Sequence, residues 1–235
     1  MVRLKFVNLK YFLLFIITET MKTTFSLGEA VEIGLDEAGR GCFWGPIYAG
    51  AVIWTPEEEW TDEHREVAPH INDSKKLSEK KRNAIAGAIK GLAIDWGVGQ
   101  VSASEIDEKG ITWANQEAFR RAMAACSSGL KPDLLLIDGV LGLPSGSDSP
   151  DDLKFKCIPG GDGLYLPIAA ASILAKVAKD TYVKEWSSAS EENKAVAAQY
   201  DLVKNKGYGT DKHRQGLKAY GAHEQHRRQF IRNWL

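Results

Sequence analysis

Cysteine is scarce in this chain of 235 residues. The three that are present, Cys42, Cys126 and Cys157, are odd in number, lie far apart and form no CxxC pair. Neither a disulfide framework nor a structural zinc site is therefore expected. A reducing, cytoplasmic setting fits this pattern best, because disulfides belong mainly to oxidising compartments.

Several catalytic signatures are also missing. The sequence contains no HExxH, no GxSxG, no GxxxxGK(S/T) and no GxGxxG that opens a helix. These absences argue against zinc peptidases, α/β-hydrolases, P-loop proteins and dinucleotide-binding folds. The formal net charge is only -1, so the overall charge does not indicate a polyanionic partner. No internal repeat or low-complexity tract is present.

A long hydrophobic run is lacking as well. The apolar stretch 11–17 follows Arg3, Lys5 and Lys10 and faintly resembles a signal peptide. It is too short to span a bilayer, and no small-residue cleavage site follows it. We therefore expect no membrane partner. Residues 1–27 are either an N-terminal extension or the product of a mis-assigned start upstream of Met21, with secretion a third option.

What is present is the hydrophobic pattern of an α/β protein. Apolar runs and alternation predict strands over residues 31–36, 47–54, 92–101, 134–138 and 155–158. Helical spacing predicts helices over residues 74–91, with Ser78 as N-cap, 104–126 and 168–186. Helices interleave with the strands and then dominate. This order indicates a core over residues 28–186 and a helical segment over residues 187–235.

The C-terminal segment is basic. Between Tyr200 and Leu235 eight lysines and arginines stand against three acidic residues, a net charge of +5 before the histidines are counted. The cations are Lys204, Lys206, Lys212, Arg214, Lys218, Arg227, Arg228 and Arg232. A phosphate-facing surface and a solvated helix face explain this charge equally well.

Four acidic residues stand at strand ends or after glycines: Asp36, Glu37, Asp138 and Asp162. Strand ends beside glycine turns are where an α/β sheet commonly places its site. Mg²⁺ and Mn²⁺ prefer carboxylate oxygens, and convergent carboxylates repel one another unless a cation is bound. The cluster therefore predicts a divalent-metal site that cuts a nucleic-acid backbone. Taken singly, Asp36, Asp138 and Asp162 are better explained as a helix cap or as turn residues.

Three further features suggest contact with nucleic acid. Gly39 and Gly41 let the backbone approach a ligand, and Arg40 between them can meet a phosphate. Lys75 lies at a predicted helix start, where amides and ammonium groups bind phosphate. Tyr208, between two glycines, can offer its ring to a sugar or base. The plainer alternatives are a tight turn, a capped helix and simple packing.

Together, the motifs resemble a known family. They are IGLDEAGRGCFWGPIYAGAV (33–52), DSKKL (73–77), LIDG (136–139), GDGLYLPIAAASILAKVAKD (161–180) and NKGYGT (205–210), closed by His226, Arg227 and Phe230. In colinear order they are similar to ribonuclease HII, the type 2 ribonuclease H. The pair DEAGRG and AAASILAK carries most of the specificity.

The resemblance implies a ribonuclease H-like fold with a mixed five-stranded sheet flanked by helices and a helical C-terminal part. It also implies an endonuclease that needs Mn²⁺ or Mg²⁺ and cuts the RNA strand of RNA–DNA hybrids. Such enzymes nick on the 5′ side of a single ribonucleotide in duplex DNA, leave 3′-hydroxyl and 5′-phosphate ends, and initiate ribonucleotide excision repair. No heptad or apolar stripe calls for a partner subunit, so we expect a monomer.

Residue roles follow from the same resemblance. The metal-binding carboxylates of the family match Asp36, Glu37, Asp138 and Asp162. Gly39-Arg40-Gly41 matches the turn that reads the ribose 2′-hydroxyl. Tyr208 matches the tyrosine that stacks near the deoxyribose after the ribonucleotide. Lys75 and Lys176 fall in motifs whose polar groups lie near substrate phosphates.

Three departures from the family pattern stand out. After GRG the family usually has a proline and small or apolar residues, whereas this chain has Cys42-Phe43-Trp44. The bulk of these residues either alters the 2′-hydroxyl pocket or packs on the C-terminal segment. Gly161 replaces a lysine and removes a positive charge beside Asp162. The loop 139–152 is longer than usual. These departures leave two alternatives: a related nuclease with broader substrates, or a nucleic-acid-binding module without activity.

Overall fold

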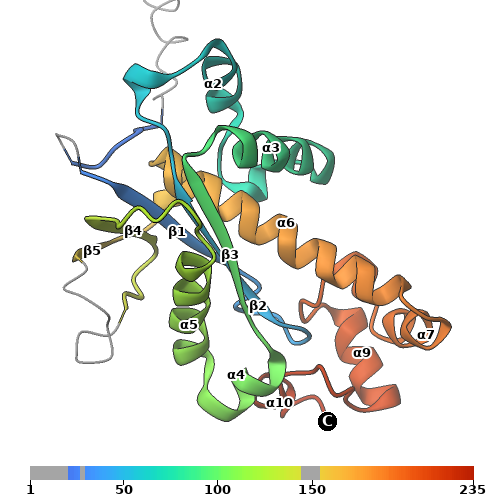
Figure 1. Cartoon of the computed structure of the whole chain (residues 1–235). Helices are drawn as coiled ribbons and strands as arrows, with labels where there is room; N and C mark the ends of the chain where they lie inside the picture. The colour runs from blue at the N-terminus through green and yellow to red at the C-terminus, as the bar shows by residue number, and fades with distance from the viewer. Residues whose placement is uncertain (1–20, 27–29, 144–153) are drawn as a thin grey trace, which may run out of the picture.

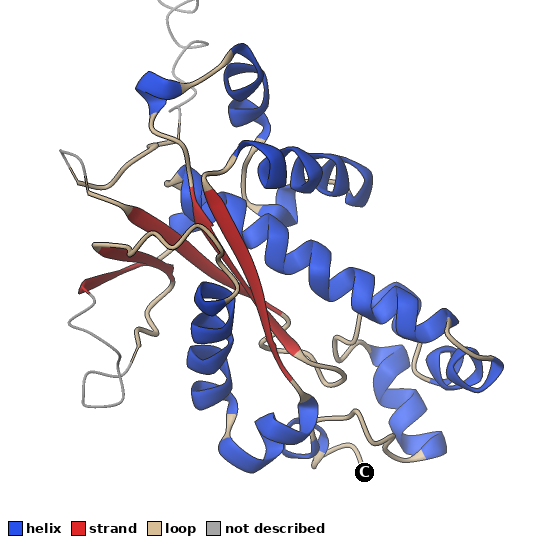
Figure 2. Ribbon diagram, in the orientation of Figure 1, coloured by secondary structure: helices blue, strands red, loops and turns tan. Residues whose placement is uncertain are grey.

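A mixed sheet of five strands forms the centre of the molecule (Figure 2). The computed structural model describes residues 21–26, 30–143 and 154–235. The strands, in the spatial order β3-β2-β1-β4-β5, are β1 (Glu32–Ala38), β2 (Ile47–Ile53), β3 (Asp95–Val101), β4 (Leu134–Asp138) and β5 (Lys154–Ile158). β1, β2 and β3 pair antiparallel, whereas β1, β4 and β5 pair parallel. The predicted α/β fold with a mixed five-stranded sheet is confirmed.

Helices cover both faces of this sheet (Figure 1). They are α2 (Asp62–Val67), α3 (Glu79–Leu92), α4 (Ala103–Lys109), α5 (Ile111–Ala124), α6 (Leu166–Ser188), α7 (Glu191–Gln199), α8 (Leu202–Asn205), α9 (Asp211–Tyr220) and α10 (Arg228–Ile231). The alanine-rich α6 lies on one face because Gly34 and Gly50 leave no side chain between strand and helix; a Cβ at either glycine would overlap the α6 backbone. α5 lies on the other face.

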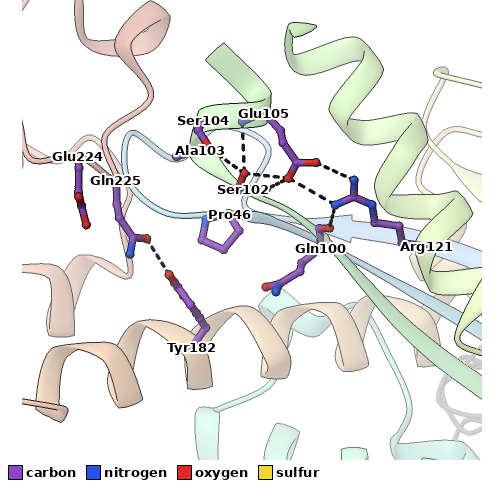
Figure 3. Close-up of a pocket in the computed structure, with 10 residues that line it drawn as sticks. All are labelled: Pro46, Gln100, Ser102, Ala103, Ser104, Glu105, Arg121, Tyr182, Glu224 and Gln225. Carbon is purple, nitrogen blue, oxygen red and sulfur yellow. Dashed lines mark hydrogen bonds and ion pairs between the residues drawn. The ribbon is translucent and has the colours of Figure 1, made fainter. Parts of the chain in front are cut away.

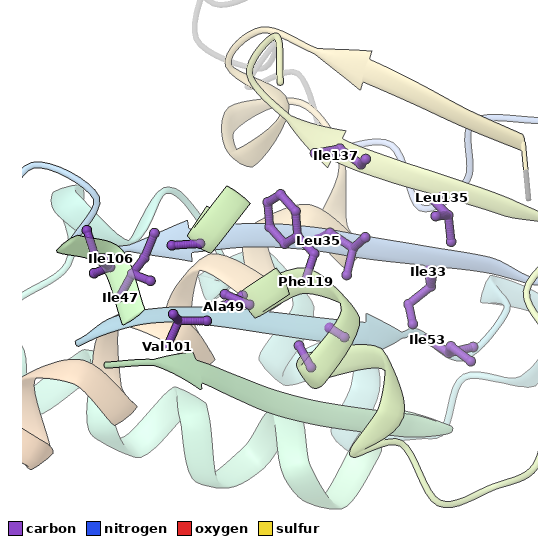
Figure 4. Packing of buried hydrophobic residues seen from close by; sticks show 14 residues of the cluster. Ile33, Leu35, Ile47, Ala49, Ile53, Val101, Ile106, Phe119, Leu135 and Ile137 are labelled. Atoms are coloured by element: carbon purple, nitrogen blue, oxygen red, sulfur yellow. The ribbon is translucent and has the colours of Figure 1, made fainter. Parts of the chain in front are cut away.

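The core between the sheet and α5 follows the two-residue period of the strands. Ile33 and Leu35 of β1 point to the same face as Leu135 and Ile137 of β4, and all four are buried. Phe119 of α5 fills the space between them (Figure 4). Because the alternate residues of β1 are buried on the side of α6, this strand runs through the middle of the domain.

The predicted elements differ from the structure in several places. The predicted helix 104–126 is wrong as a single element, since Gly110 has φ 85° and divides it into α4 and α5. The third strand begins at Asp95, because α3 continues through Leu92. α2 lies where no helix is predicted, and the Thr61 side chain caps it by accepting from the His64 amide. Ser78 caps α3 as predicted, although α3 itself begins at Glu79.

The C-terminal helices pack on the end of α6. A separate apolar cluster, the C-terminal cluster, joins them to the core, with Trp44, Val183, Ala197, Tyr200, Leu202, Leu217 and Ile231 buried in it. At the other end of the chain, the Lys22 amide donates to the Leu164 carbonyl and the Leu166 amide to the Lys22 carbonyl. Most of the predicted N-terminal extension and of the predicted loop 139–152 lies outside the described residues. Among the described residues, no helix has the length and apolar character needed to cross a bilayer.

Candidate active site

Three carboxylates meet at one edge of the sheet. Asp36 lies near the carboxyl end of β1, Asp138 ends β4, and Asp162 lies in a short turn, η4 (Gly161–Gly163), that follows β5. Parallel pairing brings these strand ends to the same edge. One carboxylate oxygen from each residue lies within 4.8 Å of the other two. We call Asp36, Asp138 and Asp162 the carboxylate cluster.

Glu37 stands beside this cluster rather than in it. It follows Asp36 along β1, and successive side chains of a strand leave opposite faces. Burial raises the pKa of Glu37, Arg40 opposes that shift, and the charge of Asp138 adds to it. The sequence predicts four convergent carboxylates, whereas the structure groups three and places the fourth within range of their charge.

The cluster concentrates negative charge in a buried place. Burial, then the charges of Glu37 and Asp138, raise the pKa of Asp36 well above its ordinary value. Burial and Asp138 likewise raise the pKa of Asp162, and the Asp162 amide donates to Asp138 Oδ1 at 3.4 Å. Carboxylates so arranged stay ionised together only when a cation offsets their repulsion. A set of oxygen donors of this kind fits a hard divalent cation.

One lysine of the predicted set lies close enough to interact with this charge. Lys75 belongs to the short helical turn η3 (Ser74–Lys76), whose start is capped by the Asp73 side chain. Burial lowers the pKa of Lys75, but the charges of four carboxylates together outweigh burial, so the pKa is raised overall; they are Asp162, Asp73, Asp36 and Asp138. Its ammonium group therefore stands near the carboxylate cluster, on a residue that remains exposed to solvent.

The segment between β1 and β2 forms a tight turn, here called the glycine turn (residues 39–45). Gly39 adopts φ 86°, a conformation that favours glycine, and its carbonyl accepts from the Cys42 amide at 3.1 Å. Arg40 and Gly41 are exposed at the tip. Because Gly39 lies three residues after Asp36, the glycine turn begins beside the carboxylate cluster.

Tyr208 lies against the glycine turn, although it is far from it along the chain. It forms an isolated antiparallel bridge with Cys42, and the Phe43 amide donates to the Gly207 carbonyl at 2.9 Å. Gly207 has φ 87°, and a Cβ there would lie 2.6 Å from the Trp44 carbonyl oxygen, so only glycine allows this approach. The Tyr208 side chain is 39% exposed, which leaves it open to a ligand.

Two lysines of α6 lie close to the Tyr208 ring. The Nζ atoms of Lys179 and Lys176 are 4.5 Å and 5.7 Å from its centroid. Lys176 also pairs with Asp180 at 2.8 Å, and Lys179 donates to the Lys206 carbonyl. Lys176 is thus placed beside the tyrosine and paired with a carboxylate of its own helix.

The bulky residues at 42–44 pack toward the C-terminal helices. Trp44 is fully buried in the C-terminal cluster, and its ring centroid lies 4.7 Å from that of Trp186. The Phe43 ring lies 5.7 Å from the His213 ring, edge to face. Of the two interpretations of Cys42-Phe43-Trp44, the structure shows packing on the C-terminal segment.

Gly161 has a packing reason as well. A Cβ at this position would lie 2.7 Å from Ile168 Cδ1 and 3.3 Å from Ile158 Cβ. Any larger residue, lysine included, requires these isoleucines to shift. The two isoleucines therefore occupy the space that a side chain at position 161 would need, and Asp162 has no positive charge at the preceding residue.

Two buried cations near the glycine turn were not recognised from the sequence. Lys179 is 1% exposed, and its stem lies against Gly39. Arg227 is 0% exposed and donates to backbone carbonyls of the turn, so this cation of the basic C-terminal segment faces neither phosphate nor solvent. For Lys179 the sequence offers no distinguishing signal, because α6 contains other charged residues as well. For Arg227 the signal was the closing motif.

A cavity of about 410 Å³ lies elsewhere, between the end of β3 and the C-terminal segment (Figure 3). Gln100, Glu105 and Arg121 line one side, and Tyr182 with Gln225 lines the other. None of the carboxylate cluster lines this cavity. The candidate site is a sheet edge beside a turn, separate from this cavity.

Comparison with known proteins gives a consistent result. The family model described as Ribonuclease HII matches residues 33–233. A ribonuclease HII of Idiomarina loihiensis is 39% identical over 199 residues, which are 84% of this chain and 93% of that protein. A ribonuclease HII of Clostridium perfringens is 40% identical over 202 residues, which are 86% of this chain and 67% of that protein.

Solved structures show the same fold. The ribonuclease H2 of Pyrococcus horikoshii OT3 superposes with a TM-score of 0.63 at 22% identity, over 86% of this chain and 96% of the other. A ribonuclease HIII, Bst-RNase HIII, in complex with Mn²⁺ superposes with a TM-score of 0.57 at 21% identity, over 83% of this chain and 64% of the other.

Proposed function

The chain belongs to the ribonuclease HII family, and we propose that it nicks duplex DNA on the 5′ side of a single embedded ribonucleotide. It is a ribonuclease H hydrolase, and members of its family cleave the RNA of RNA–DNA hybrids. The proposed products are 3′-hydroxyl and 5′-phosphate ends. The proposed cellular role is to initiate ribonucleotide excision repair.

The carboxylate cluster, with Glu37 beside it, would hold Mg²⁺ or Mn²⁺. Three carboxylates within 4.8 Å of one another, two of them with pKa values raised by burial and repulsion, fit a hard divalent cation. When bound, such an ion polarises the phosphodiester and favours attack by water. Lys75, exposed beside the cluster, would meet a neighbouring phosphate.

Substrate choice is proposed to rest on the glycine turn and Tyr208. The exposed backbone at Arg40 and Gly41 can approach a ribose closely, because no side chain covers Gly41. Tyr208 lies across the turn and can stack near the following deoxyribose. Lys176 lies near the Tyr208 ring, within the region that a substrate backbone would cross.

The observation that supports this proposal most is the adjacency of the two features. Asp36 and Gly39 are three residues apart, so a ribose bound at the turn would have its phosphate near the carboxylate cluster. The broader-substrate alternative relied on bulk at Cys42-Phe43-Trp44, which packs away toward the C-terminal segment. That packing favours nicking at a single ribonucleotide over the alternative.

The test is a nicking assay on three duplexes: all DNA, DNA with one ribonucleotide, and a continuous RNA–DNA hybrid, each with Mn²⁺ or Mg²⁺. We expect a nick 5′ of the single ribonucleotide, none in all-DNA duplex, and loss of the nick in EDTA. Cleavage of the continuous hybrid alone would contradict the proposal and support the broader-substrate alternative.

We also propose a cytoplasmic location and a monomeric state. The location is supported by three free cysteines, which no disulfide joins among the described residues. The monomer is supported by a sequence without a heptad pattern. Size-exclusion chromatography with light scattering tests the oligomeric state.

A further inference from the structure

Arg227 reaches the glycine turn from the C-terminal segment. Its Nε donates to the Gly45 carbonyl at 2.9 Å, and its Nη1 donates to the carbonyls of Gly39 at 2.8 Å and Arg40 at 2.9 Å. The side chain is 0% exposed. One guanidinium group therefore holds both ends of the turn through its rigid, planar donors.

Stability alone is a poor explanation for this arrangement. Burial lowers the pKa of Arg227 to about 10, and within the described part of the chain it forms no ion pair, while its Nη2 has no hydrogen-bond partner. A buried charge without a carboxylate partner is expensive, and an apolar residue commonly serves better for stability. The Phe230 ring, 5.5 Å from the guanidinium carbon, offers partial compensation.

The contacts determine where the amides of the turn point. In a trans peptide the carbonyl and the following N–H point in opposite directions. The Gly39 and Arg40 carbonyls point inward to Arg227, so the N–H groups of Arg40 and Gly41 point outward. Across the described residues these two amides have no hydrogen-bond acceptor, whereas the Cys42 amide closes the turn on Gly39.

We propose that Arg227 is a positioning residue for ribose recognition: it orients the glycine turn so that the Arg40 and Gly41 amides face the 2′-hydroxyl. The proposal deepens the proposed function and rests on it. Arg227 itself touches no substrate, because it is fully buried. Its placement makes the C-terminal segment part of the specificity machinery.

The experiment measures a specificity ratio. The rate of nicking at one ribonucleotide is divided by the rate at a 2′-deoxy-2′-fluoro nucleotide in the same duplex, for wild type and for Arg227→Lys. Lysine keeps the charge but cannot reproduce the planar, multiple donation. We expect the ratio to fall about tenfold, the equivalent of one lost hydrogen bond, with kcat reduced and KM little changed.

Two variants separate positioning from loss of folding. Phe230→Leu removes the ring beside the guanidinium and should lower the ratio about two- to fivefold. Ile89→Val is the control, because Ile89 is fully buried in a different apolar cluster, which contains neither Phe230 nor any residue of the glycine turn. It should lower the folded fraction and leave the ratio unchanged.

The possible results distinguish the inference from the proposed function. If wild type nicks the single-ribonucleotide duplex but Arg227→Lys keeps the ratio, the inference fails while the proposed function stands. If Arg227→Lys does not fold, an unchanged ratio in Phe230→Leu overturns the inference. If wild type does not nick this duplex, the proposed function fails, and the inference fails with it.

Discussion

The carboxylate cluster and the glycine turn adjoin along the chain but are held in different ways. Parallel strand pairing brings Asp36, Asp138 and Asp162 together, although their like charges oppose it. The glycine turn is instead held by a cation from a distant segment, Arg227, which donates to its carbonyls. The carboxylate cluster thus needs a bound cation to offset its negative charge, whereas the glycine turn is held by a cation of the chain itself.

The two regions therefore have different roles: the carboxylate cluster supports cleavage, and the glycine turn selects the substrate. The strand pairing that forms the cluster does not involve the C-terminal segment, whereas the orientation of the turn depends on that segment. Changes in the cluster should therefore abolish cleavage of every substrate. Changes around the turn should alter which substrate is cleaved.

The largest expected effect follows Asp138→Asn. Cleavage of all substrates should fall on the order of 10³-fold, because several kcal/mol of charge stabilisation is lost. Thermal stability in EDTA should rise, since the charge of Asp138 raises the pKa of both Asp36 and Asp162. Single-turnover kinetics and thermal melts measure the two effects. Asp62→Asn, exposed on α2, is the control, and retention of cleavage within about tenfold in Asp138→Asn would contradict the assignment.

Tyr208→Ala tests the other region. Stacking contributes about 1–3 kcal/mol per base, so cleavage at a single ribonucleotide should fall about 5- to 150-fold, with a smaller loss of duplex binding. Tyr220→Ala, at an exposed tyrosine of α9, is the control. Equal losses in cleavage and binding would show that the ring anchors the duplex rather than positions it.

Gly161→Lys restores the residue usual in the family. Because Ile168 Cδ1 lies 2.7 Å from the position of the new Cβ, the free energy of unfolding should fall by about 1–3 kcal/mol. Gly163→Lys is the matched control, since nothing lies within 4 Å of its Cβ position. Denaturant titration compares the two, and equal stability would show that the isoleucines give way.

The last expected effect concerns stability alone: the free energy of unfolding should depend on pH because of two buried histidines. His213 Nδ1 donates to the Tyr208 carbonyl at 3.0 Å, and the Nε2 atoms of His213 and His226 share a hydrogen bond of 2.9 Å. Burial lowers the pKa of His213 to about 4 and, with the charge of His213, that of His226 to about 3.

The sign follows from proton counting. Unfolded histidines bind protons below about pH 6.5, whereas the folded pair stays neutral until about pH 4. Stability is therefore fully present above pH 6.5 and is lost as the pH falls toward 4, by up to about 1.4 kcal/mol per pH unit for each proton. His226→Gln should flatten this slope in denaturant titrations, and exposed His70→Gln should not. The raised pKa values of the cluster act in the opposite direction.

Local patterns determined much of this protein. Five strands and α6 follow from the pattern of apolar residues, and Asp138 at the end of an apolar run indicated a strand end. The cap at Ser78 follows from its residue type at the start of a helical pattern. Gly110 was harder to interpret, because a glycine inside a helical pattern divides the helix only when its φ becomes positive. The motifs identified the acidic residues as a set, since residue type and order suffice for that.

Tertiary structure alone decided which of these residues meet. The cluster holds three carboxylates rather than four because Glu37 leaves the other face of β1. The cations of the basic C-terminal segment also differ in their surroundings. Lys212 is exposed, whereas Arg227 is buried against the glycine turn. Contacts between residues nearly two hundred positions apart depend on chain topology, and one-dimensional spacing does not contain that information.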